Sequence, residues 1–135
     1  MDMHIIIGGA YSGKRQFVRN KWSNAKWISA YEGASFEDVD NAPIIVMEGF
    51  EVWVSQLIKM GKTDQEIVQY FHDKWSSLSS SQELILIMLE VGRGIVPINV
   101  HDRRLRDVMG WIQQDAVKMA NKVTSIWHGL AKTMK

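Results

Sequence analysis

Residues 3–17 of the chain read MHIIIGGAYSGKRQF, an apolar run that passes through a glycine-rich turn into a helical pattern. The spacing of Gly8, four residues and then Gly13-Lys14 matches the Walker A pattern of phosphate-binding loops. The glycines of such a loop let backbone N–H groups approach phosphate oxygens, and its lysine reaches the outer phosphates. A helix that starts here adds unpaired N–H donors and a partial positive charge. The stretch therefore predicts a nucleotide-binding loop made of Gly8, Gly9, Ala10, Tyr11, Ser12, Gly13, Lys14 and Arg15.

One position in this loop departs from the pattern. Where a serine or threonine would place a hydroxyl on Mg²⁺, the chain has Arg15, whose guanidinium cannot ligate a cation but can pair with a phosphate. Nucleotide binding is therefore indicated more strongly than phosphoryl transfer. The alternative interpretation is an ordinary strand-to-helix turn that happens to be rich in glycine.

Composition excludes several classes of protein. With 135 residues and 46% hydrophobic content, the chain is expected to form a single domain over residues 1–135. Sixteen basic and fifteen acidic residues give a net charge close to zero, which does not favour binding to nucleic acid or to a membrane surface. The absence of cysteine excludes disulfides, Cys-based zinc sites and thiol nucleophiles. No apolar run has the length of a signal peptide core or a membrane span, so a cytoplasmic protein is expected.

Hydrophobic periodicity and turn residues predict the remaining elements. Strands are expected at residues 25–30, 43–49, 82–91 and 122–127, with a short last strand at 131–135 antiparallel to its predecessor. Helices are expected at residues 15–22, 50–60, 63–78 and 102–121, and residues 31–41 are expected to form a polar connection. This order predicts an α/β fold of the P-loop class, with a mostly parallel sheet and helices on both faces.

Two of the predicted strands end in an acidic residue, Glu48 and Glu90. Ligands of open parallel sheets bind outside the carboxyl ends of the strands, so both carboxylates are expected near the phosphate loop. A carboxylate in that place can hold Mg²⁺ directly or through water. Mg²⁺ is therefore the predicted cofactor, with Glu48 and Glu90 as its ligands. For Glu48 a solvated strand end, or an acid at a helix N-terminus, is an equally open interpretation.

The loop and a second, more specific motif resemble a known family. Residues 8–14 are similar to the phosphate loop of the bifunctional adenosylcobinamide kinase/adenosylcobinamide-phosphate guanylyltransferase family of cobalamin biosynthesis. Residues 90–97, which read EVGRGIVP, resemble that family's C-terminal third, and Glu48 resembles its strand-end glutamate. The resemblance continues without a gap through Arg103, Arg106, Asp107, Gly110, Gln114, Val123, Gly129 and Lys135.

This resemblance implies a RecA-like domain assembled as a homotrimer with sites between neighbouring subunits. It also implies that ATP or GTP phosphorylates a hydroxyl of cobinamide and that GMP is then transferred onto the new phosphate. In the family, the segment after the second strand is longer and carries the histidine that becomes guanylylated, whereas residues 29–41 contain no histidine. Guanylyl transfer by that route is therefore expected to be absent. Arg15 also replaces the family's serine.

The leading hypothesis is a shortened, cobinamide-kinase-like nucleotide-binding protein that retains at most kinase activity. Lys14 and the loop amides would hold the β and γ phosphates of ATP or GTP, while Glu48 and Glu90 would position Mg²⁺ or the attacking hydroxyl. The rival hypothesis is a non-catalytic relative that holds a nucleotide or a phosphate as a regulatory or scaffold protein. A nucleic-acid-binding module is a weaker third hypothesis. The tryptophans expected on helices, which are more typical of core or subunit-interface packing, are Trp22, Trp53, Trp75 and Trp111.

Overall fold

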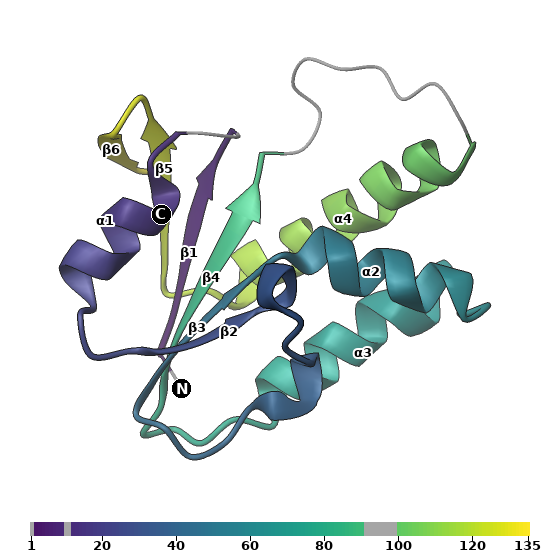
Figure 1. Ribbon diagram of the computed structural model, residues 1–135, viewed down its shortest axis with the longest axis horizontal. Coiled ribbons are helices and arrows are strands. Elements are labelled where there is room, and N and C mark those ends of the chain that lie inside the picture. Colours follow the sequence, from purple (N-terminus) through teal and green to yellow (C-terminus); the bar gives the residue numbers. More distant parts are fainter. Residues whose placement is uncertain (1, 10–11, 91–99) are drawn as a thin grey trace.

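The computed structural model describes residues 2–9, 12–90 and 100–135 (Figure 1). Within these residues six strands form one sheet in the order β2-β3-β4-β1-β5-β6. The first five strands run parallel to their neighbours, and the last is antiparallel to β5. The strands are β1 (Asp2–Gly8), β2 (Lys26–Ser29), β3 (Ile44–Glu48), β4 (Glu83–Leu89), β5 (Lys122–Trp127) and β6 (Leu130–Thr133).

Helices cover both faces of this sheet (Figure 1). One face carries α1 (Lys14–Lys21), and the other carries α2 (Phe50–Lys59), α3 (Asp64–Ser76) and α4 (Val100–Met119). The predicted fold class, a mostly parallel α/β sheet with helices on both faces and a short antiparallel strand at its C-terminal end, is confirmed. In the part of the chain that the structure describes, no helix is long and apolar enough to cross a membrane.

The central strand β1 supplies side chains to two separate cores. Because successive side chains of a strand point to opposite faces, Met3 and Ile5 pack in the core beneath α2, α3 and α4, whereas Ile6 packs with Val18 and Trp22 on the α1 side. A parallel strand that is covered on both faces reads as a continuous apolar run. The apolar run of β1 therefore anchors the start of the glycine-rich loop in the middle of the sheet.

Local stop and start signals in the sequence lie at the end of α2 and at the start of α3. Thr63 caps α3 and forms a reciprocal capping box with Glu66, as their spacing predicts. Gly61 follows α2 with a positive φ of 84°. Of the tryptophans expected to pack, Trp22, Trp53 and Trp75 are buried, whereas Trp111 on α4 is half-exposed.

The connection at residues 31–41 has more structure than its polar sequence suggests. It contains two short 3-10 turns, η1 (Ala30–Glu32) and η2 (Phe36–Asp38). Phe36 is buried among the rings of Phe50 and Phe71, which lie 6.2 Å and 4.6 Å away between centroids. This single buried aromatic ring holds the connection against α2 and α3. Of the EVGRGIVP motif at residues 90–97, only Glu90 lies within the described residues.

Candidate functional site

The carboxyl ends of β1, β3 and β4 meet at one edge of the sheet because the three strands are parallel. In their register Gly8 pairs with Leu89, and the N–H of Glu90 donates to the carbonyl oxygen of Gly8 at 3.0 Å. Glu48 ends β3, which is separated from β1 by β4. The two acidic residues and the glycine loop therefore belong to one edge, as predicted.

Lys14 is buried at the start of α1 and turns its ammonium back onto its own loop. Its Nζ donates to the carbonyl oxygens of Gly9 at 2.6 Å and Gly8 at 3.1 Å, and it lies 3.4 Å from the hydroxyl of Ser12. Burial lowers the pKa of Lys14, while the nearby carboxylates of Glu51 and Glu48 act in the opposite direction. A largely desolvated cation held by neutral carbonyls is well placed to receive an anion.

Close packing constrains the two described ends of this loop, at Gly8 and at Ser12. A Cβ on Gly8 would lie 2.5 Å from the Oγ of Ser12 and 2.7 Å from the carbonyl oxygen of Ile126, so no larger residue fits there. The N–H of Gly129, in the turn after β5, donates to the carbonyl oxygen of Ser12 at 2.9 Å. The C-terminal hairpin therefore supports the loop from outside. Ala10 and Tyr11, both predicted loop residues, lie outside the described residues.

Glu48 is 1% exposed, and both of its carboxylate oxygens are engaged. Oε2 accepts a hydrogen bond from the hydroxyl of Ser29 at 2.6 Å. Oε1 lies 3.0 Å from the Nε of Arg15. Arg15 was expected to face a phosphate, and here it pairs with this protein carboxylate.

These residues do not fit a Mg²⁺ site in the arrangement observed. Mg²⁺ requires oxygen ligands in a near-octahedral shell, and the guanidinium of Arg15 lies against the carboxylate of Glu48 that would supply one of them. Across the described residues, no group of three or more His, Cys, Asp or Glu side chains is arranged to hold a metal ion. The Mg²⁺ ligation predicted for Glu48 and Glu90 stays a prediction.

A cavity of about 550 Å³ opens beside the loop. Lys14, Arg15 and Glu48 line it together with Tyr31, and Ile87 and Leu89 of β4 supply apolar wall. Its volume and its mixture of two cations with apolar surface suit a nucleoside phosphate or another small anionic molecule. Gly8, Gly9 and Glu90 lie outside this cavity wall as the structure describes it.

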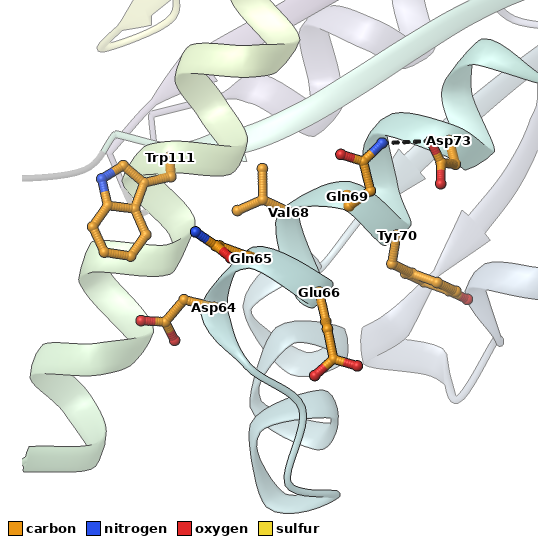
Figure 2. Close-up of a pocket in the computed structure, with 8 residues that line it drawn as sticks. All are labelled: Asp64, Gln65, Glu66, Val68, Gln69, Tyr70, Asp73 and Trp111. Carbon is orange, nitrogen blue, oxygen red and sulfur yellow. Dashed lines mark hydrogen bonds between the residues drawn. The ribbon is translucent and has the colours of Figure 1, made fainter.

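A second and larger hollow, of about 1010 Å³, lies on the outer side of α3 and α4 (Figure 2). Figure 2 shows acidic and amide side chains of α3 around it, with the ring of Trp111 at its border. Its carboxylates already have local partners. Asp64 pairs with Arg104 at 2.7 Å and Glu66 belongs to the capping box of α3, while Asp73 accepts a hydrogen bond from Gln69. The smaller cavity beside the glycine-rich loop is therefore the better candidate site.

The site also contains residues that sequence reasoning did not identify. Ser29, at the end of β2, pairs in register with Glu48 and fixes its carboxylate. Tyr31 lies in the wall of the cavity, and its hydroxyl donates to Glu51 at 2.7 Å. Burial and this hydrogen bond to Glu51 raise the pKa of Tyr31, so it is a neutral donor at neutral pH. The signal that could have found Ser29 and Tyr31 is their place just at or after a parallel strand, the criterion that singled out Glu48.

Two of the described histidines, His4 and His72, make their contacts outside the cavity wall. His72 pairs with Asp115 between α3 and α4 at 2.8 Å. His4 shares a hydrogen bond of 2.7 Å with Thr124. Neither ring reaches the cavity wall beside Lys14.

Comparisons with known proteins agree with the resemblance seen in the sequence. A protein of Pyrococcus horikoshii OT3 whose structure was solved in a structural study is similar in fold, with a TM-score of 0.51 and 7% sequence identity. The match covers 99% of this chain and 86% of that one. A search of the curated proteins gave no match. The family model for cobinamide kinase / cobinamide phosphate guanyltransferase matches residues 18–134, which begin just after the glycine loop. Since this match spans most of its length, the chain belongs to the cobinamide kinase / cobinamide phosphate guanyltransferase family.

Proposed function

We propose that this chain is a nucleotide-binding, cobinamide-kinase-like protein of cobalamin biosynthesis, which binds ATP or GTP and at most phosphorylates a hydroxyl of a cobinamide-like acceptor. Family membership supports the pathway and the substrate class. The single observation that supports the nucleotide site is Lys14, a buried ammonium bonded to the carbonyl oxygens of its own glycine loop beside the cavity. Because the family match begins at residue 18, the loop is assigned from its own pattern and geometry.

In the proposed reaction, the hydroxyl oxygen of the acceptor attacks the γ-phosphorus. The bond from that phosphorus to its bridging oxygen breaks, and ADP or GDP leaves. Lys14 and the loop amides hold the negative charge of the β and γ phosphates. Glu90 is not part of the described cavity wall but directly follows the wall residue Leu89, and it is proposed to orient the attacking hydroxyl and accept its proton. No step of this scheme depends on the predicted Mg²⁺.

The second candidate is a non-catalytic relative that binds a nucleotide or a phosphate as a regulatory or scaffold protein. It is favoured by the ion pair between Arg15 and Glu48, which occupies the carboxylate that would otherwise serve phosphoryl transfer. The variant Arg15→Ser discriminates the two candidates. Phosphorylation of cobinamide by the wild-type chain, or by this variant in the presence of Mg²⁺, would favour the kinase, and inactivity of both proteins would favour the non-catalytic candidate.

We also propose that the protein acts as a homo-oligomer, a trimer by resemblance to its family, without nucleic acid or a membrane as partner. The near balance of sixteen basic and fifteen acidic residues supports a protein without nucleic acid or a membrane as partner. Guanylyl transfer is not part of the proposal, because residues 29–41 contain no histidine to carry the guanylyl group.

Calorimetric titration with ATP and GTP tests the nucleotide site through the variant Lys14→Ala. A charged hydrogen-bond donor contributes about 1.5–3 kcal/mol, so affinity should fall by about 10- to 150-fold. The matched control is Lys21→Ala, which removes the same charge from the exposed last turn of the same helix and should leave affinity unchanged. Unchanged affinity in Lys14→Ala would contradict the proposed site.

A further inference from the structure

The pairing of Arg15 with Glu48 places a permanent cation where a phosphate loop normally has a metal ligand. The Nε of Arg15 lies 3.0 Å from one oxygen of Glu48, and Ser29 donates to the other at 2.6 Å. The carboxylate is nearly inaccessible to water at 1% exposure. A buried carboxylate needs a compensating charge, and removing that partner is costly. Arg15 is therefore an integral part of this site.

The same pairing works against a divalent cation. A Mg²⁺ ion here would need the carboxylate of Glu48, and the hydroxyl that usually completes its protein shell is absent at position 15. The ion would also have to sit beside the guanidinium, and repulsion between like charges is strong in a partly desolvated site. For Glu48 to bind a metal, Arg15 would have to leave it.

The rest of the guanidinium remains available to a ligand. Arg15 is half-exposed and lines the cavity next to Lys14. Its Nη2 lies 3.8 Å from Glu32, an exposed carboxylate whose weak attraction a phosphate can replace. The ring of Trp27 lies 5.6 Å from the guanidinium carbon and supports it from one side. With Nε bound to Glu48, the terminal nitrogens are the donors left for phosphate oxygens.

We propose, resting on the nucleotide-binding function above, that this site binds its nucleoside phosphate without a divalent metal. Arg15 supplies, together with Lys14, the positive charge that a metal would otherwise bring. Glu48 serves as an anchor that orients Arg15, and the ligand class is a metal-free nucleoside di- or triphosphate.

The first test compares the wild-type chain in two buffers. ATP and GTP are titrated calorimetrically with Mg²⁺ present and with EDTA present. We expect the two affinities to agree within about threefold, a difference of about 0.65 kcal/mol. Binding that is at least about tenfold tighter with Mg²⁺ would overturn the inference and leave the proposed nucleotide function standing. No binding in either buffer would overturn both.

The second test uses Arg15→Ser, with Arg19→Ser as its matched control. Arg19 lies one turn further along the same helix and also stacks on Trp27, at 5.1 Å, but it is outside the cavity wall. In EDTA the affinity of Arg15→Ser for ATP should fall by at least about tenfold, and Mg²⁺ should restore part of it. The control should match the wild type in both buffers.

Unchanged affinity of Arg15→Ser in EDTA would overturn the role of Arg15. Circular dichroism and a thermal melt establish whether this variant is folded, because it leaves Glu48 buried without its cation. The comparison of the wild-type chain in two buffers requires no variant, so it decides the question even if Arg15→Ser does not fold.

Discussion

His4 lies buried near the amino end of β1, on the face that α1 covers. Its Nε2 shares a hydrogen bond with Thr124, and its ring meets Trp22 edge-on at 5.1 Å between centroids. Burial, with a smaller contribution from Lys21 and Lys122, lowers the pKa of His4 to about 4, while Asp2 acts in the opposite direction. The folded protein therefore keeps His4 neutral in a range of pH where an unfolded histidine is protonated.

We expect this histidine to make folding less stable as the pH falls from 6.5 to 4. In that window the unfolded chain binds a proton at His4 and the folded chain does not, so acid favours unfolding. The contribution is about 1–3 kcal/mol across the window. Urea unfolding at a series of pH values should show a shallower pH dependence in His4→Asn than in the wild type. His128→Asn, at an exposed turn position, is the control. Equal pH dependence in His4→Asn and the wild type would contradict this assignment.

At the scale of elements, local patterns predicted most of the fold. The apolar runs of β3 and β4 and the capping box of α3 are visible in the sequence because each depends on neighbours within a few residues. Phe36 was missed because one aromatic residue in a polar segment has no period, and its burial depends on rings from α2 and α3.

Sequence patterns placed Lys14 and Glu48 at one edge of the sheet, but they did not predict the ion pair between Arg15 and Glu48. The strand-end rule placed Lys14 and Glu48 at the same edge. The partner of Arg15 could not be predicted, because a guanidinium satisfies a phosphate or a carboxylate equally well. Arg15 pairs with the carboxylate because of β2. The parallel pairing of β2 with β3 brings Ser29 against one oxygen of Glu48 and leaves the other oxygen facing Arg15 on α1.

Helix α2 offers a comparison of two glycines with nearly the same backbone. Gly49 caps its start with a φ of 85°, and Gly61 follows its end with a φ of 84°. A Cβ on Gly49 would lie 2.8 Å from the Cβ of Ala30 and 3.3 Å from the backbone nitrogen of Tyr31, whereas a Cβ on Gly61 would meet nothing within 4 Å. Both alanine variants incur the strain of a positive φ, and Gly49→Ala also displaces the wall of the cavity.

We therefore expect Gly61→Ala to lower the free energy of unfolding by about 1 kcal/mol and Gly49→Ala by about 2–4 kcal/mol. Denaturant unfolding measures both values. Gly49→Ala should also weaken nucleotide binding, because Tyr31 and Glu48 line the same cavity. Equal losses of stability in the two variants would mean that the backbone at residues 30–31 moves aside without cost.

At the scale of the whole molecule, the C-terminal hairpin combines an open sheet edge with exposed apolar side chains. Strand β6 forms one border of the sheet, and each of its residues is exposed. Trp127, Leu130 and Met134 on this hairpin are 68%, 68% and 61% exposed. Open edges and apolar patches of this kind are typical of surfaces that bind another chain. Because Gly129 in the turn of this hairpin also donates a hydrogen bond to Ser12 of the glycine-rich loop, a contact made here would affect the candidate site.

The proposed trimer predicts a sedimentation-equilibrium mass of about three chains of 15.5 kDa each. If the hairpin forms the contact between copies, Leu130→Lys should shift the protein toward the monomer, because it places a charge on the apolar border of β6. Met60→Lys is the matched control, since Met60 is an equally exposed apolar residue (69%) at the end of α2, away from the hairpin. A wild-type mass of one chain would contradict the proposed oligomer, and a trimeric Leu130→Lys would place the contact on another surface. Nucleotide titration of a monomeric variant would then show whether the proposed nucleotide site depends on assembly, because Gly129 of the same hairpin supports its glycine-rich loop.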